Sequence, residues 1–362
     1  MNKPTLKRWV FLTMKNKNHL PVLLLLSVSM SGIISILDRV EYPLINTYFS
    51  QGFYPVHFRL NKLFFENSTF SFGDLFYLLV AIALGILCFR TNRFNWRKHL
   101  RIFFSFTALV YITFLLSWGL NYYRGKQIDA PTYSTKELLK FSAHLANQLN
   151  KLHAQLQTVD SLPIEIQRNK KEIIQNIQAH QNQRTDGIPG FVKPSLYSLP
   201  LTYMGFSGYL NPFTLEAQVN DRIPLLSLPV TVAHEMAHQQ GIASEAEANF
   251  IGFSTVISHP DADMRYAAYL FAFRYCFAQL YRNSPEKANG LRQKMRQGIF
   301  ANIQQQALFW KAYQNPFEPI FKKTYDSYLK ANAQTHGIQS YSRVVALLIN
   351  AYLEENQSAI QE

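Results

Sequence analysis

The sequence predicts a mainly α-helical protein with three N-terminal transmembrane helices, followed by a mostly helical domain with a small β element. Over the first third of the chain, apolar runs without charged residues alternate with short basic blocks, whereas the later sequence repeats apolar residues at helical spacing. The chain has 362 residues, 48% hydrophobic and only 16% charged, so it is too apolar to be disordered. We therefore expect a membrane domain at residues 1–123 and a second domain at residues 124–362.

The net charge of +13 is concentrated in two blocks. Residues 1–17 and 90–101 hold ten basic residues and no acidic one. Basic blocks beside apolar runs are typical of membrane topology, whereas a DNA- or RNA-binding protein carries its positive charge on a folded face. We therefore expect no nucleic-acid partner. The chain has two cysteines, Cys88 and Cys276, which excludes a disulfide framework and a CxxC metal site.

Three apolar runs predict transmembrane helices at about residues 18–37, 70–89 and 102–123. A helix needs about 20 apolar residues to cross a bilayer, and the second run reaches that length only with the residues before it. A buried helix of a soluble protein, or a cleaved signal peptide for the first run, is the alternative. The basic blocks place the N-terminus in the cytoplasm and the C-terminal domain outside, with the lipid bilayer as a partner. Trp118, at the outer end of the third run, suits an aromatic belt at the lipid interface.

The C-terminal domain shows helix signals on both sides of a turn-rich segment. Ser134 and Glu137 form a capping-box pattern before a helix of apolar periodicity. Residues 186–230 are rich in proline and glycine and predict turns with one or two short strands. Helical patterns return at residues 230–282 and 286–355.

The strongest functional signal is an HExxH motif, His234-Glu235-Met236-Ala237-His238, within a helical segment. Residues four apart share one face of a helix, so His234 and His238 can bind the same metal ion. Glu235 is then placed to deprotonate a water molecule at that ion. The motif predicts Zn²⁺ as cofactor, and Glu235 as the general base of a hydrolytic reaction.

A third metal ligand is expected shortly after the motif, because catalytic zinc has three protein ligands and an open position. Gly241 is suited to end the first helix, and Ser244 to cap the next one with Glu247 in its capping box. Glu245 is then the carboxylate free to turn back to the metal, and Asn249 lies on the same face to hydrogen-bond a ligating imidazole. The alternative is Glu247 as ligand, or two solvated acids at a helix start.

Further groups suit substrate binding and transition-state stabilisation. Tyr341 and Arg343, at the start of the last helical run, are candidate donors to the transition state; a helix-capping or ion-pair role is the alternative. Residues 202–209 are a candidate edge strand along which an extended peptide would lie, or else a plain surface turn.

The motif and the residues after it resemble zinc peptidases whose third ligand is glutamate, including membrane enzymes with an E-x-x-A-D signature, in which Asn249 replaces the aspartate. More closely, nearly the whole chain resembles an uncharacterised bacteroidete family of membrane proteins of zinc-peptidase type, defined by a domain of unknown function. The stretches that carry this resemblance are Ser71–Asp74, Trp118–Arg124, Lys193–Ser195, Gly208–Thr214, His234–Gln239 and Glu247–Phe250.

The resemblance implies a zincin-like metallopeptidase domain in the periplasm, anchored in a bacterial cytoplasmic (inner) membrane, with a peptide or protein of the cell envelope as substrate. In the better-known glutamate zincins the third ligand follows a longer insertion, whereas Glu245 comes seven residues after His238. The chain is therefore expected to be a membrane-anchored zinc metallopeptidase. The alternative is a non-catalytic envelope scaffold that retains the fold.

Overall fold

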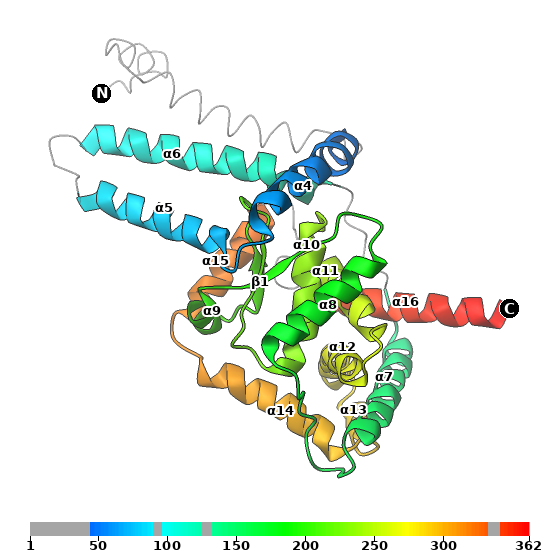
Figure 1. The fold of residues 1–362 in the computed structure, drawn as a ribbon. Helices are drawn as coiled ribbons and strands as arrows, with labels where there is room; N and C mark the ends of the chain where they lie inside the picture. Colours follow the sequence, from blue (N-terminus) through cyan, green and yellow to red (C-terminus); the bar gives the residue numbers. More distant parts are fainter. Residues whose placement is uncertain (1–43, 90–95, 125–131, 332–340, 362) are drawn as a thin grey trace, which may run out of the picture.

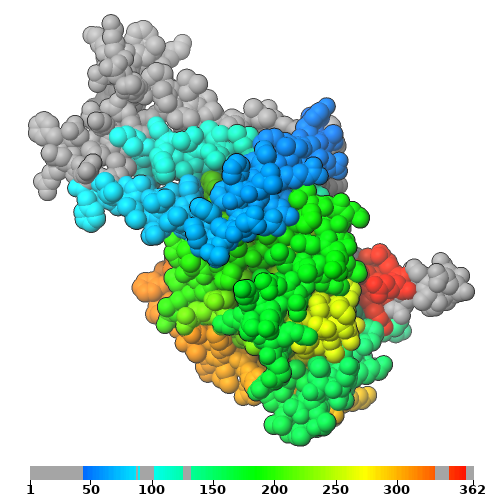
Figure 2. Space-filling view, in the orientation of Figure 1, coloured from blue at the N-terminus to red at the C-terminus, as the bar shows by residue number. Residues whose placement is uncertain are grey.

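The computed structural model describes residues 44–89, 96–124, 132–331 and 341–361. The protein is mostly helical, as the sequence indicates, and holds one small sheet. In Figure 1, helices from the middle of the chain form a packed body, the N-terminal helices lie across one end of it, and the last helix projects from another side. Figure 2 shows the N-terminal helices, blue to cyan, pressed against the green surface of this body.

The helices span the following residues: α4 Tyr54–Phe65, α5 Phe72–Phe89, α6 Trp96–Ser117, α7 Thr135–Leu156, α8 Lys170–Arg184, α9 Ser198–Met204, α10 Leu228–Gln239, α11 Glu245–Ile257, α12 Ala262–Asn283, α13 Pro285–Arg292, α14 Gln297–Ala312, α15 Glu318–Ala331 and α16 Tyr341–Gln361. Shorter turns of other helix types are the π-helix Ile45–Phe53 and the 3-10 helices Gly119–Tyr123 and Leu225–Ser227. The strands are β1 Val192–Pro194, β2 Gly208–Leu210 and β3 Ala217–Val219.

The main core surrounds α10, which carries the HExxH motif. The predicted capping box of Ser134 and Glu137 is confirmed at the start of α7. This helix packs along α12 with fully buried leucines such as Leu138 and Leu145. Helices α8, α11 and α12 and strand β3 all pack against α10. The motif is therefore built on a helix of which most residues are buried.

The sheet has the strand order β1-β3-β2, with β1 parallel and β2 antiparallel to β3. Lys193, Gln218 and Tyr209 form the middle row across the three strands and contact residues near the start of α5, whereas Ala217 and Val219 point into the main core. The segment expected to hold only turns and one or two strands thus contains three strands and, in addition, helix α9.

The prediction of three N-terminal transmembrane helices is wrong. Within the described ranges, no helix combines the length and the hydrophobicity that crossing a membrane requires. The first predicted span, residues 18–37, lies outside the described residues. The inner-membrane location and the lipid bilayer as partner are not tested by the structure and stay predictions.

Contacts with the body explain where the two later segments depart from the expected spans. Asp74, in the first turn of α5, is fully buried and accepts hydrogen bonds from Ser195 Oγ (3.0 Å) and Leu196 N (2.6 Å). Helix α6 ends at Ser117, and Trp118 beyond it is buried in protein rather than lying in an aromatic belt. The start of α5 and the residue that follows α6 are thus packed against the rest of the protein.

Residues before and after position 123 share a second cluster of apolar side chains. Phe58 of α4 stacks on Phe191, which precedes β1, with ring centroids 6.3 Å apart. Trp118 and Leu329 of α15 belong to the same cluster. Residues on both sides of position 123 therefore pack together, and the expected division at this position stays a prediction.

Candidate metal centre

The local sequence makes α10 and α11 a tight helical hairpin. Pro229 occupies the first turn of α10, where a backbone N–H has no helical partner to lose. Gly241 ends the helix with a φ of 79°, a left-handed conformation that glycine adopts without strain, and its N–H donates to the carbonyl of His238 (3.0 Å). Ser244 then caps α11 by accepting a hydrogen bond from Glu247 N (3.4 Å). This turn places Glu245 at the first residue of α11, beside the motif.

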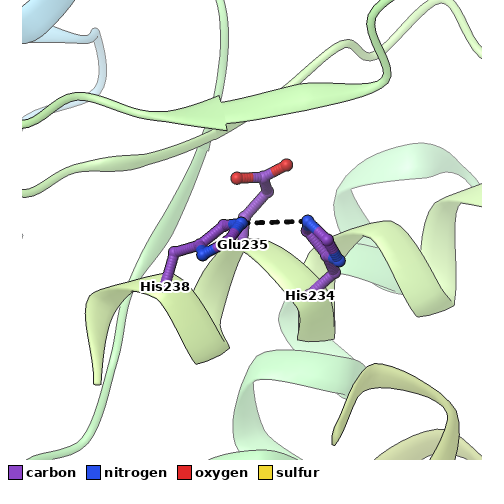
Figure 3. A group of neighbouring side chains, drawn as sticks. All are labelled: His234, Glu235 and His238. Atoms are coloured by element: carbon purple, nitrogen blue, oxygen red, sulfur yellow. Dashed lines mark hydrogen bonds between the residues drawn. The ribbon is translucent and has the colours of Figure 1, made fainter. Parts of the chain in front are cut away.

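Three potential ligand atoms converge at this turn. The Nε2 atoms of His234 and His238 lie 3.0 Å apart, as Figure 3 shows. Of the two oxygens of the Glu245 carboxylate, Oε2 lies 3.4 Å from His234 Nε2 and Oε1 lies 3.6 Å from His238 Nε2. Three ligands of a tetrahedral zinc ion, each about 2.0–2.1 Å from the metal, would be separated by about 3.3 Å. The observed separations bracket that value.

Hydrogen bonding determines which nitrogen of His238 faces this point. His238 Nδ1 lies 2.6 Å from the carbonyl oxygen of Ile242, so Nδ1 carries the proton and donates it to that carbonyl. The lone pair of Nε2 is then directed at His234 and Glu245. Such a bond from the outer nitrogen is typical of histidines that ligate metals.

The Glu235 side chain rises between the two imidazoles, on the same side of α10, and extends toward the sheet (Figure 3). Its side chain is almost fully buried under Gly208 of β2, where a Cβ atom would lie only 2.7 Å from Glu235 Oε1. Its Oε2 atom has no hydrogen-bond partner among the described residues. Burial raises the pKa of Glu235 to about 8; the negative charge of Glu245 adds to this effect and His234 opposes it.

The opposite charges of Glu245 and His234 stabilise each other, which shifts the pKa values of both groups. Burial alone would raise the pKa of Glu245, but its contacts with His234 and His238 outweigh burial and lower the value to about 2. Burial opposes a charge on His234 too, yet its contact with Glu245 raises its pKa. Burial lowers the pKa of His238 to about 4. A positive charge is thus favoured at the point where Glu245 meets the imidazoles.

These residues fit a metal cation. His234, Glu235 and His238 bring one potential ligand atom each within 4.8 Å of one another, and Glu245 reaches both imidazoles. The ionised carboxylate and the free Nε2 lone pair form the mixed nitrogen and oxygen donor set that zinc accepts. The side chains of His234 and Glu245 remain 13% and 21% exposed, so solvent reaches part of each.

The chain matches a protein family over residues 49–349, and this family is described as proteins of unknown function (DUF3810). The match covers most of the chain. The protein belongs to this family. No curated protein and no solved structure matches the chain. The family assignment therefore carries no activity, and the function must be argued from the site of this DUF3810 member itself.

The other residues singled out in the sequence lie around this centre or away from it. Asn249 lies beside His234, and its amide favours the protonated imidazole. Glu247 does not join the three ligand atoms; burial raises its pKa, and the nearby charge of Arg343 opposes this shift. Arg343 therefore lies on the Glu247 side of α11. The side chain of Tyr341 is outside the described part of the structure.

Two residues at the centre were not foreseen. The Tyr325 hydroxyl of α15 donates a hydrogen bond to Glu245 Oε1 (2.8 Å), 80 positions along the chain. Gly208 provides the space that Glu235 occupies. No spacing rule links either residue to the HExxH motif, since only the packing of α15 and β2 on α10 and α11 brings them there.

The N-terminal helices also reach the centre, through the C-terminal end of α10. The last carbonyl groups of a helix have no partner within it. Here Trp118 Nε1 donates to the carbonyl of His238 (3.0 Å), and the Tyr54 hydroxyl donates to that of the next residue, Gln239 (2.8 Å). Arg124 Nη1 donates to the following carbonyl, that of Gln240 (2.9 Å). Donors from residues 54–124 thus hold the helix end that carries His238.

Proposed function

We propose that the protein is a zinc-dependent metallopeptidase. The convergence of the His234, His238 and Glu245 ligand atoms at separations of 3.0–3.6 Å carries the proposal. The burial of Glu235 beside them supports it, because a structural metal site needs no additional carboxylate. The resemblance to zinc peptidases supports the same reaction class for this member of the family.

Each residue of the centre has a distinct role in this proposal. His234, His238 and Glu245 would hold the zinc ion. When bound, the ion supplies Lewis-acid chemistry that acidifies a water molecule and polarises the peptide carbonyl. Glu235 takes the proton of the attacking water and passes it to the leaving amine. Its buried Oε2 atom, which has no hydrogen-bond partner among the described residues, is available for this proton transfer.

Strand β2 offers a binding edge for an extended peptide. It pairs with β3 on one side, and within the described residues no strand pairs with its other side. Gly208 of this strand lies directly over Glu235. A peptide added antiparallel to β2 would be held by backbone hydrogen bonds along the general base, so we propose peptide or protein substrates.

The direct test combines zinc content with hydrolysis in the purified full-length protein. The metal-replete protein should contain one zinc ion per chain, and a His238→Ala variant should lose it. Glu235→Gln should keep zinc and lose hydrolysis of an unstructured protein such as casein by at least 100-fold, because only the base is removed.

The matched control is Glu247→Gln, which changes a carboxylate of α11 that lies outside the ligand set. This variant should keep both zinc and activity. A wild-type protein without zinc after metal-replete preparation contradicts the proposal. If Glu235→Gln retains full activity in a zinc-loaded protein, the reaction does not use this base, and the scaffold alternative gains support.

A further inference from the structure

Helix α15 lies on the surface, and Tyr325 and Leu329 are among its residues turned toward the body. Leu329 is fully buried in the second apolar cluster, and Tyr325, one turn before it, packs against the same cluster. The start of the helix is attached to α9: Asn315, just before it, donates to the carbonyl of Tyr203 (2.7 Å), and Glu318 lies against Gly205. These contacts hold α15 across the α11 side of the metal centre.

The hydroxyl of Tyr325 ends at the metal centre rather than in solvent. It donates to Glu245 Oε1, and its ring packs edge-to-face on Phe206 with centroids 5.3 Å apart. The same Glu245 oxygen lies 3.6 Å from His238 Nε2, while the second oxygen, Oε2, lies 3.4 Å from His234 Nε2. One lone pair of Oε1 is therefore occupied by the phenol, which limits how the carboxylate can rotate.

Building on the proposed zinc site, we propose that Tyr325 is a positioning residue that holds Glu245 in the orientation of the third metal ligand. A carboxylate at the first residue of a helix can adopt several rotamers, several of which point to solvent. A hydrogen bond from outside the ligand set selects the rotamer that meets both imidazoles. Zinc affinity then depends on α15, a helix that itself supplies no ligand.

Tyr328 provides a matched comparison on the same helix. Its hydroxyl pairs with that of Tyr122 at 3.5 Å, whereas the hydrogen bond to Glu245 Oε1 comes from Tyr325. Removing either hydroxyl deletes one polar atom and leaves the ring in place. The Tyr325 hydroxyl, which donates directly to Glu245, should have the larger effect on metal binding.

The experiment measures zinc dissociation constants of the full-length protein by competition with a chromogenic chelator. Tyr325→Phe should weaken zinc binding by about 10–100-fold, the usual effect of removing an outer hydrogen bond to a ligand. Tyr328→Phe should change it less than about twofold. A Phe206→Leu variant, which loosens the same packing but keeps the hydroxyl, separates an effect of the hydroxyl from one of packing.

A double-mutant cycle shows whether Tyr325 acts through Glu245. In a Glu245→Gln background, which already lacks the ligating carboxylate, Tyr325→Phe should have little further effect on zinc affinity. Equal zinc affinity of wild type and Tyr325→Phe overturns the inference, as does an undiminished effect in the Glu245→Gln background or an equal loss in Phe206→Leu. A wild-type protein that binds no zinc overturns the proposed function instead, so the two failures are distinct.

Discussion

Two sets of buried charged residues in this protein differ in how fully their polar atoms are paired. Lys193 of β1 donates to Glu216 Oε1 (2.9 Å) and to the carbonyl of Phe70 (3.2 Å). Glu216 Oε2 accepts hydrogen bonds from Gly73 N (2.6 Å) and Thr214 Oγ1 (2.9 Å). Neither charged side chain has an unpaired buried atom. In the metal centre, by contrast, Glu235 Oε2 and His234 Nδ1 have no hydrogen-bond partner in the described residues.

The difference separates a structural site from a candidate functional one. A buried polar atom without a partner costs about 1–3 kcal/mol, so the unpaired atoms beside the HExxH histidines call for an explanation. The Lys193–Glu216 pair joins the turn before α5 to the sheet and needs nothing more. In the candidate metal centre, two buried polar atoms, Glu235 Oε2 and His234 Nδ1, have no hydrogen-bond partner among the described residues.

Breaking the fully hydrogen-bonded Lys193–Glu216 pair should have the largest effect on stability. Glu216→Ala leaves the Lys193 ammonium buried without its counter-charge, which should reduce the free energy of unfolding by about 3–5 kcal/mol in urea denaturation. The double variant Lys193→Met/Glu216→Leu removes both charges and should recover part of this loss. A cost below about 1 kcal/mol for Glu216→Ala would show that the pair is not structural.

Neutralising Glu235, whose Oε2 atom has no hydrogen-bond partner, should raise the stability of the metal-free protein relative to wild type near neutral pH. The Glu235 pKa rises from 4.5 unfolded to about 8 folded, so its stabilising contribution is complete below pH 4.5 and is lost as the pH rises through 8. The full loss is on the order of 5 kcal/mol. Glu235→Gln stays neutral, so it should lose less stability than wild type between pH 5 and 8. Urea unfolding in EDTA checks this; parallel losses in the two proteins would contradict the comparison.

Changing the residue that makes room for Glu235 should have an intermediate effect. In Gly208→Ala the new Cβ would lie 2.7 Å from Glu235 Oε1 and 2.8 Å from the carbonyl of Gln218, so β2 has to shift. We expect a loss of about 1–3 kcal/mol in unfolding free energy and at least tenfold slower hydrolysis. The control is Gly290→Ala in α13, where the added Cβ meets no atom within 4 Å and a helical alanine stabilises. Unchanged hydrolysis in Gly208→Ala would show that β2 does not position the base.

The sequence was informative where the determinants are local. The positions of Gly241 and Ser244 around the α10–α11 turn follow from backbone conformation and capping, and the structure confirms them. The helical spacing of His234 and His238 brings them together as expected. These features depend on residues within about ten positions of each other.

The remaining features depend on tertiary packing, which no local pattern records. An apolar run in a sequence does not show whether lipid or protein covers it. Trp118 is therefore expected at a membrane interface, but in the structure it donates a hydrogen bond to the carbonyl of His238. Tyr325 had no distinguishing signal, because a tyrosine on an amphipathic helix is common. Arg343 lies near Glu247, whose pKa its charge lowers against the effect of burial, and its role as a transition-state donor stays a prediction.

A histidine outside the centre extends the comparison and gives the smallest expected effect. His153 of α7 is fully buried, and both of its ring nitrogens are paired. Arg296 Nε donates to Nδ1 (2.9 Å), so Nδ1 carries no proton, and Nε2 donates to the carbonyl of Leu162 (3.0 Å). Burial lowers the pKa of His153 and the charge of Arg296 adds to this, although the Leu162 carbonyl opposes it.

The neutral ring of His153 should therefore make the protein less stable in mild acid. The unfolded state binds a proton near pH 6.5 and the folded state only at lower pH, so this contribution to stability is complete above pH 6.5 and is lost as the pH falls below it. Ring titration by nuclear magnetic resonance should show His153 neutral at pH 6.5, with the proton on Nε2. In metal-free protein His234, whose pKa is raised, should keep its charge to higher pH in the same titration. If the two histidines titrate together, the pairing of their ring nitrogens does not distinguish the structural from the functional site.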